Sequence, residues 1–281
     1  MRVVFWPGGE GRAQEVLAAA LRPPYLPGFP GRRAPVPSTI VLAPSPQVFD
    51  SVTGGRAPEW GAGVAIPSTG TIVLPVYASP RTRPEQLPVT LRHELVHLAL
   101  HQELPGRIPR WFNEGYAEWV SGGWSPDEAW RLRVAFLLGR APPLDSLTLD
   151  WPWEANQARL AYLLSATAVQ HLAERSGPRG FETLMAAWKR EGSLDRAIRA
   201  VYGMTMGQFE EEWRKLVQRR YGWMMILFQA TVFWLAASVL VMGLFWLRKR
   251  RDRAKLAELR AEERMLPPPP PPGLDVDYPL E

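Results

Sequence analysis

Two histidines and a glutamate in one short segment could together hold and activate a metal ion. The segment His93-Glu94-Leu95-Val96-His97 contains two of the four histidines in the chain. On a helix, residues four apart lie on one face a turn apart, so both imidazoles can reach one zinc ion at about 2.0–2.1 Å. Glu94 can interact with a metal-bound water without binding the metal itself. This HExxH pattern predicts metal-assisted hydrolysis; the alternative is an amphipathic helix with two satisfied histidines.

A catalytic zinc site also needs a third protein ligand, with one coordination position left open. His101 continues the four-residue spacing, but it lies about 12 Å from His93 along the helix axis, so one zinc cannot bind both. Glu103 stands where a metzincin has its third histidine, but Leu100 replaces the glycine that those enzymes need. The better candidate is Glu114, on the next predicted helix.

A helix–turn–helix pair can bring this glutamate against the two histidines. Residues 88–100 have helical spacing, Pro105-Gly106 is a stop signal, and Pro109 can begin a second helix. Glu114 and Glu118 lie four apart on that helix, so one can bind zinc while the other accepts a hydrogen bond from a ligating histidine. Their aromatic neighbours predict partial burial, which a carboxylate tolerates only with a partner. The alternative is a pair of solvated surface carboxylates.

These two segments resemble the gluzincin metallopeptidases, most closely the bacterial peptidase MA-like group. HELVH is followed by PRWFNEGYAEWV, and the Asn113-Glu114 pair matches the third-ligand motif of that family. The resemblance continues in AYLLSATAVQHLAERSG and FEEEWRKL, and it covers roughly residues 38 to 221. It implies the following site residues: zinc ligands His93, His97 and Glu114, general base Glu94, and Glu118 supporting a histidine ligand.

The resemblance also implies a reaction, the hydrolysis of peptide bonds by zinc-activated water. Glu94 would take a proton from the water and deliver it to the leaving amine. Gluzincins often stabilise the oxyanion with a tyrosine or histidine from the helical subdomain, and Tyr162 is the first candidate here, His171 the second. Ordinary helix packing is the alternative for both. An edge strand within residues 63–74 would bind an extended peptide.

The elements that must position these residues predict an α+β protein of the zincin-like fold. It should comprise a small N-terminal β-sheet, the HExxH helix, a helical C-terminal subdomain and one transmembrane helix. Residues 38–44 and 71–76 read as strands, the latter preceded by a hairpin turn at Ser68-Thr69-Gly70. Helices are expected at 160–175, 178–190, 194–201 and 205–221.

The expected domain organisation has five parts along the chain. They are a loop-rich N-terminal segment (1–37), the β-sheet and zinc-binding helices (38–123), the helical subdomain (124–221), a transmembrane helix (223–247) and a basic, proline-rich tail (248–281).

A membrane anchor is expected because residues 224–247 carry no charge. As a helix they would be about 36 Å long, which is more than the roughly 30 Å thickness of the hydrocarbon core of a bilayer. The alternative is a helix buried in the protein core. Residues 248–255 hold six basic residues against one acidic, which favours a single-pass protein with a cytoplasmic tail and an extracytoplasmic catalytic domain. Because MRVVFWPGGEGR lacks the apolar stretch of a signal peptide, we expect an export signal upstream of the printed start; the alternative is a domain that faces the cytoplasm.

Composition excludes other classes of site and partner. The chain has no cysteine, which excludes disulfides and thiolate zinc sites. Its net charge of +5 comes without a recognisable reader module, so no nucleic acid partner is expected. The expected partners are a peptide or protein substrate and the lipid bilayer; the oligomeric state stays open.

Two further functions compete with a peptidase. One is a catalytically silent zincin-like domain that binds peptides or partners, against which the intact Glu94 argues. The other is a membrane-tethered scaffold acting through the basic cluster and the run Pro267–Pro272. The scaffold hypothesis does not explain why the chain contains the motifs HELVH and NEGYAE.

Overall fold

The computed structural model describes residues 1–55, 62–77, 86–122, 131–132, 134–135, 141–152, 154–175, 177–221 and 223–265. The chain divides into two compact units, Met1–Met224 and Met225–Glu281. The boundary expected between residues 123 and 124 therefore lies inside the first unit. The run Pro267–Pro272 and the rest of the proline-rich tail lie outside the described residues.

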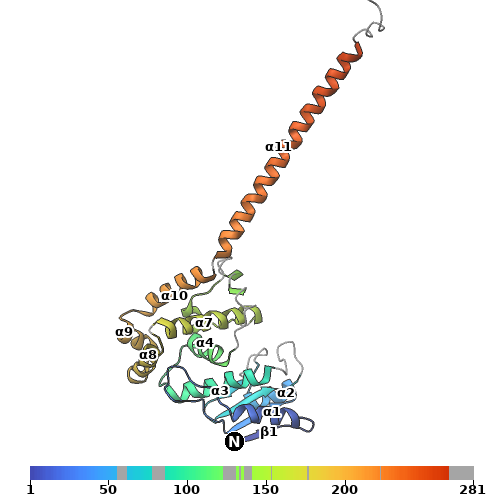
Figure 1. Cartoon of the computed structure of the whole chain (residues 1–281). Coiled ribbons are helices and arrows are strands. Elements are labelled where there is room, and N and C mark those ends of the chain that lie inside the picture. Colours follow the sequence, from blue (N-terminus) through green and yellow to red (C-terminus); the bar gives the residue numbers. More distant parts are fainter. Residues whose placement is uncertain are drawn as a thin grey trace, which may run out of the picture. The chain divides into compact units, whose positions relative to one another are not determined.

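A four-stranded sheet in the order β1-β2-β4-β3 lies in the first unit (Figure 1). β1 (Arg2–Val4) pairs parallel with β2 (Thr39–Ala43), and β2 pairs parallel with β4 (Thr71–Pro75). β3 (Val64–Ile66) pairs antiparallel with β4 and forms one edge. The two central strands are almost continuously apolar and buried, as expected of strands covered on both faces. The strands and the hairpin expected from the sequence are confirmed.

Helices cover both faces of this sheet. The apolar side chains of each central strand alternate between the two faces, so both faces need cover. On one face, Ile40 and Ile72 join a core with α1 (Glu10–Ala20) and α3 (Leu87–Glu103). On the other face, Val41 and Val73 pack with Phe49 of α2 (Pro46–Thr53). The first 37 residues, expected to be loop-rich, thus supply one strand and one helix as well as loops.

The remaining helices of the first unit build the helical subdomain. Their bounds are α4 (Arg110–Ser121), α6 (Leu144–Leu149), α7 (Ala155–Arg175), α8 (Gly177–Glu191), α9 (Leu194–Tyr202) and α10 (Met206–Tyr221). The helices expected after residue 160 are confirmed. α4 packs against both α3 and α7 (Figure 1). At the α4–α7 crossing, a Cβ on Gly115 would lie 2.4 Å from the carbonyl of Ser165, so only glycine permits this approach.

The described part of the second unit is helical. α11 (Trp223–Met265) has 43 residues and continues from the apolar stretch through the basic cluster. Among the described helices, it contains one segment, Thr231–Glu262, that is long and apolar enough to cross a membrane, and the apolar window of this segment is not buried in protein. The buried-core alternative for this stretch is therefore not supported.

Candidate metal centre

Helix α3 places His93, Glu94 and His97 together. The imidazole rings of the two histidines lie 4.8 Å apart, edge to face. One ligand atom from each of the three residues lies within 4.8 Å of the other two. Glu94 is only 6% exposed, although it carries an ionisable group. The one-turn spacing read from the sequence thus produces the shared face that metal binding requires.

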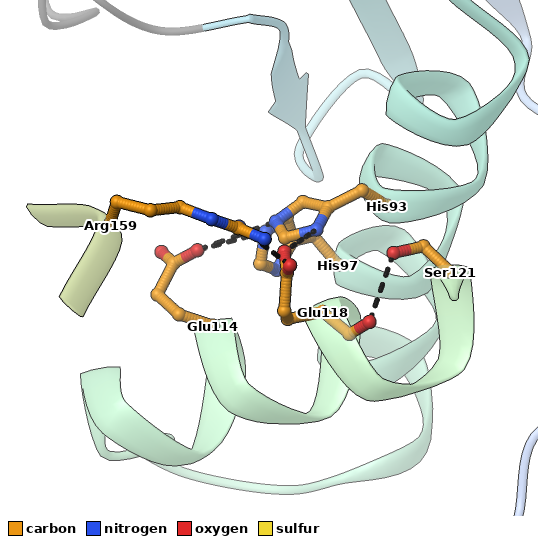
Figure 2. A network of polar contacts seen from close by, with 6 residues as sticks. All are labelled: His93, His97, Glu114, Glu118, Ser121 and Arg159. Atoms are coloured by element: carbon orange, nitrogen blue, oxygen red, sulfur yellow. Dashed lines mark hydrogen bonds and ion pairs between the residues drawn. The ribbon is translucent and has the colours of Figure 1, made fainter. Parts of the chain in front are cut away.

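Helix α4 brings a fourth side chain to the same place. Pro109 precedes its first residue, and Gly122 ends it in the left-handed conformation (φ 75°). Glu114 and Glu118 both lie within the helix, and because they are four residues apart they are one turn apart on the same face. Both carboxylates point toward α3 (Figure 2). Oε2 of Glu114 lies 3.5 Å from Nε2 of His93 and 3.4 Å from Nε2 of His97.

These separations fit a zinc ion. Two ligands that each lie about 2.0–2.1 Å from a tetrahedral zinc are about 3.3–3.4 Å from one another. Both nitrogen–oxygen distances have this size, and the two imidazoles and one carboxylate are the donor set of catalytic zinc sites. Such a set leaves one coordination position for water or substrate. The residues present therefore fit Zn²⁺.

The charges in the site are strongly coupled. Burial would raise the pKa of Glu114, but the two histidines outweigh it and hold this pKa well below its usual range. Burial would lower the pKa of His97, but Glu114 and then Glu94 raise it to about 9. Burial raises the pKa of Glu94, whereas both histidines and the nearby backbone amide of Ala65 lower it. A carboxyl group with a raised pKa suits a general base that must later act as an acid.

Further polar contacts orient the two imidazoles. Oε2 of Glu118 lies 3.7 Å from Nδ1 of His93, and Nη1 of Arg159 donates a 2.6 Å hydrogen bond to Oε1 of Glu118 (Figure 2). Asn113 lies beside His97 and helps to raise its pKa. Among the described residues, Nδ1 of His97 and Oδ1 of Asn113 are both buried and have no hydrogen-bond partner. Contacts of this kind fix the tautomer and the ring orientation of ligating histidines.

Sequence reasoning missed the roles of Asn113 and Arg159. Asn113 had a local signal, because it immediately precedes the expected ligand Glu114. Arg159 had none, because it comes from α7, 41 residues after the carboxylate that it contacts.

The two candidates for stabilising the oxyanion lie in different places. The ring of Tyr162 lies 6.0 Å from that of His93, and burial followed by the charges of Glu114 and Glu94 raises its pKa well above 10. Tyr162 therefore keeps its proton at neutral pH. Nε2 of His171 instead lies 3.3 Å from Oε1 of Glu212 on α10, and its ring stacks on Phe209, away from the metal centre.

The two residues set aside as ligands are also accounted for. Glu103 forms ion pairs with Lys189 and Arg32, and His101 is exposed at the end of α3. Neither belongs to the metal centre.

We predict that zinc affinity increases as the pH rises toward 9. The raised pKa means that His97 is protonated in the metal-free protein at neutral pH, and it must lose this proton to bind zinc. Below that pKa, each lower pH unit should weaken binding about tenfold for the one proton released. Chelator competition on the intact chain, from about pH 7 to pH 9, measures this slope. A dissociation constant that does not change over this range contradicts the prediction.

Comparison with known proteins supports the picture drawn from the site. A family model described as the peptidase MA superfamily matches residues 33–219, which include every residue of the metal centre. The comparison with curated proteins gives no match for the chain.

Proposed function

Because this chain belongs to the peptidase MA superfamily, we propose that it is a membrane-anchored zinc metallopeptidase of the gluzincin type. One observation carries the proposal: the Nε2 atoms of His93 and His97 meet the same oxygen of Glu114 at 3.5 and 3.4 Å. Glu94, buried beside them, is the proposed general base. The proposed ligands of Zn²⁺ are His93, His97 and Glu114.

The protein's own residues divide the catalytic work. Bound zinc supplies a Lewis acid that polarises the scissile carbonyl and lowers the pKa of a bound water toward neutrality. Glu94 accepts the proton of the attacking water and then donates it to the nitrogen of the leaving amine. Glu118 and Asn113 hold the imidazoles of His93 and His97 in orientation.

Tyr162 is proposed to donate a hydrogen bond to the oxyanion of the tetrahedral intermediate. Tyr162→Phe should lower kcat by about 10²–10³-fold, as the loss of one oxyanion donor does, with zinc still bound. Tyr202→Phe is a matched control, because the Tyr202 hydroxyl donates a hydrogen bond to the carbonyl of Leu172. Equal kcat values for Tyr162→Phe and the unchanged chain would remove Tyr162 from the mechanism.

Strand β3 is proposed to bind the substrate backbone. Among the described strands, β3 pairs only with β4, so its other side is an edge of the sheet. Ala65 of this strand lies near Glu94, whose pKa the Ala65 backbone lowers. An extended peptide can pair with such an edge, next to the proposed base.

Helix α11 is proposed to anchor the chain in a membrane, with the catalytic domain outside the cytoplasm and the basic side inside. Its apolar segment meets the length requirement, and the basic cluster that follows favours this orientation. The cysteine-free chain allows a clean test with single cysteines at exposed positions, Thr183→Cys in the domain and Glu258→Cys in α11. A membrane-impermeant maleimide should label intact cells only at Thr183→Cys. The reverse pattern contradicts the orientation.

Cleavage of a peptide library by the full chain in detergent tests the activity. We expect products detectable by mass spectrometry that disappear with a chelator and return when zinc is restored. A chain that binds zinc and leaves every peptide intact would instead be the catalytically silent, peptide-binding domain.

A further inference from the structure

Small and large side chains alternate in Gly63 and the strand β3 that follows it. The segment reads Gly63-Val64-Ala65-Ile66, of which Val64–Ile66 is β3. Val64 and Ile66 pack with the cluster on the α2 face of the sheet, whereas Ala65 packs with the core on the α3 face. Gly63 lies on the α3 side as well, since a Cβ there would meet Thr90 and Glu94 of α3. Both positions facing the metal-binding helix therefore carry the smallest residues.

Gly63 leaves little room for a side chain against that helix. A Cβ at this position would lie 3.1 Å from Cγ of Glu94, 3.0 Å from Cγ2 of Thr90 and 3.1 Å from Cδ2 of Leu74. Ordinary carbon–carbon contacts have their optimum at about 3.5–4.0 Å. Thr90 and Glu94 lie one turn apart on α3, so the backbone at Gly63 rests directly on the turn that carries the proposed base.

Ala65, two residues further, lies near the other end of the same side chain. Its backbone amide is close enough to the Glu94 carboxylate to lower the pKa of that group. Glu94 is thus approached along its length: the Gly63 backbone lies against the aliphatic stem, and the Ala65 amide lies near the charged group. Both contacts depend on how closely the strand approaches α3.

We propose that Gly63 is a positioning residue for catalysis, whose missing side chain lets this strand hold Glu94 in the orientation of a general base. The inference rests on the proposed function, since it concerns the efficiency of that base. A displacement of about 1 Å in a catalytic group can cost about 10²-fold in rate, so one added methyl group is enough to be measured.

The test compares the same substitution at two glycines. Gly63→Ala adds a methyl group against Glu94, and Gly11→Ala adds one on α1, where the new Cβ would meet no described side chain within 4 Å. For the full chain in detergent, we expect Gly63→Ala to lower kcat by about 10-fold or more, with KM and zinc affinity nearly unchanged. Gly11→Ala should keep the kcat of the unchanged chain. If Gly63→Ala does not fold, Gly63→Ala with Thr90→Ala relieves one contact, keeps the contact with Glu94 and should show the same loss.

Amide hydrogen exchange gives a readout that does not need activity. If the strand holds Glu94 as proposed, the Ala65 amide should be protected in the unchanged chain and in Gly11→Ala, and it should exchange faster in Glu94→Ala and in Gly63→Ala. An unchanged kcat and an unchanged Ala65 exchange rate in Gly63→Ala overturn the inference. A parallel loss of zinc binding and thermal stability with kcat would also overturn it, because the role would then be structural. If the chain cleaves no peptide, the proposed function fails, and the exchange data still decide whether Gly63 positions Glu94.

Discussion

Replacing Glu94 by glutamine should abolish peptide hydrolysis while zinc stays bound. Glutamine keeps the size of the side chain but cannot accept a proton from water at neutral pH. General acid–base catalysis contributes about 10²–10⁴-fold to rate, so kcat should fall by that factor or below detection. The ligands His93, His97 and Glu114 are untouched, and the zinc content should match that of the unchanged chain. Kinetics with a cleaved peptide, together with zinc analysis of the same preparation, measure both quantities.

Glu103→Gln is the matched control for this substitution. It makes the same chemical change on the same helix, at a carboxylate that pairs with Lys189 and Arg32 and lies outside the metal centre. It should leave kcat unchanged. Should Glu94→Gln cleave peptides at the rate of the unchanged chain, Glu94 is not the base.

Replacing Glu114 by alanine should weaken zinc binding more than replacing a residue that only orients one of the ligating histidines. Loss of an outer-shell partner of a metal ligand typically costs about 10–100-fold in affinity, so loss of the ligand itself should cost more than about 100-fold. Loss of the carboxylate should also lower the pKa of His97, which eases proton loss at neutral pH, so the affinities are compared near pH 9, where proton competition is small. Chelator competition measures the dissociation constant of the full chain.

Glu118→Ala provides the comparison on the same helix. Glu118 contacts Nδ1 of His93 and Arg159, so its loss should cost only about 10–100-fold in zinc affinity. The opposite order, with Glu118→Ala the more damaging change, would exchange the roles assigned to the two carboxylates.

Much of the metal centre could be predicted because its signals are local. The four-residue spacings of His93 with His97, and of Glu114 with Glu118, each place two groups on one helix face. The proline and glycine signals around residues 105 and 109 predicted two successive helices, which the structure confirms. Only the meeting of the two helices needed the structure.

Contacts between distant elements had no such signal. Arg159 reaches Glu118 across the contact between α4 and α7. The role proposed for Gly63 depends on the absence of a side chain, which no residue pattern indicates. β1 is three residues long, too short to show a period, and it forms only by pairing with β2. The α1 helix did carry a signal that was overlooked, since its buried residues Ala13, Val16 and Ala20 recur at helical spacing.

The zinc content of the full chain, purified and then dialysed against metal-free buffer near neutral pH, is the most direct check on the account. We predict one tightly held zinc per chain, with an X-ray absorption spectrum of two imidazole nitrogens and oxygen ligands at about 2.0–2.2 Å. His93→Ala should lose the ion. An unchanged chain that retains no zinc, or one whose zinc survives His93→Ala, contradicts the shared centre formed by α3 and α4.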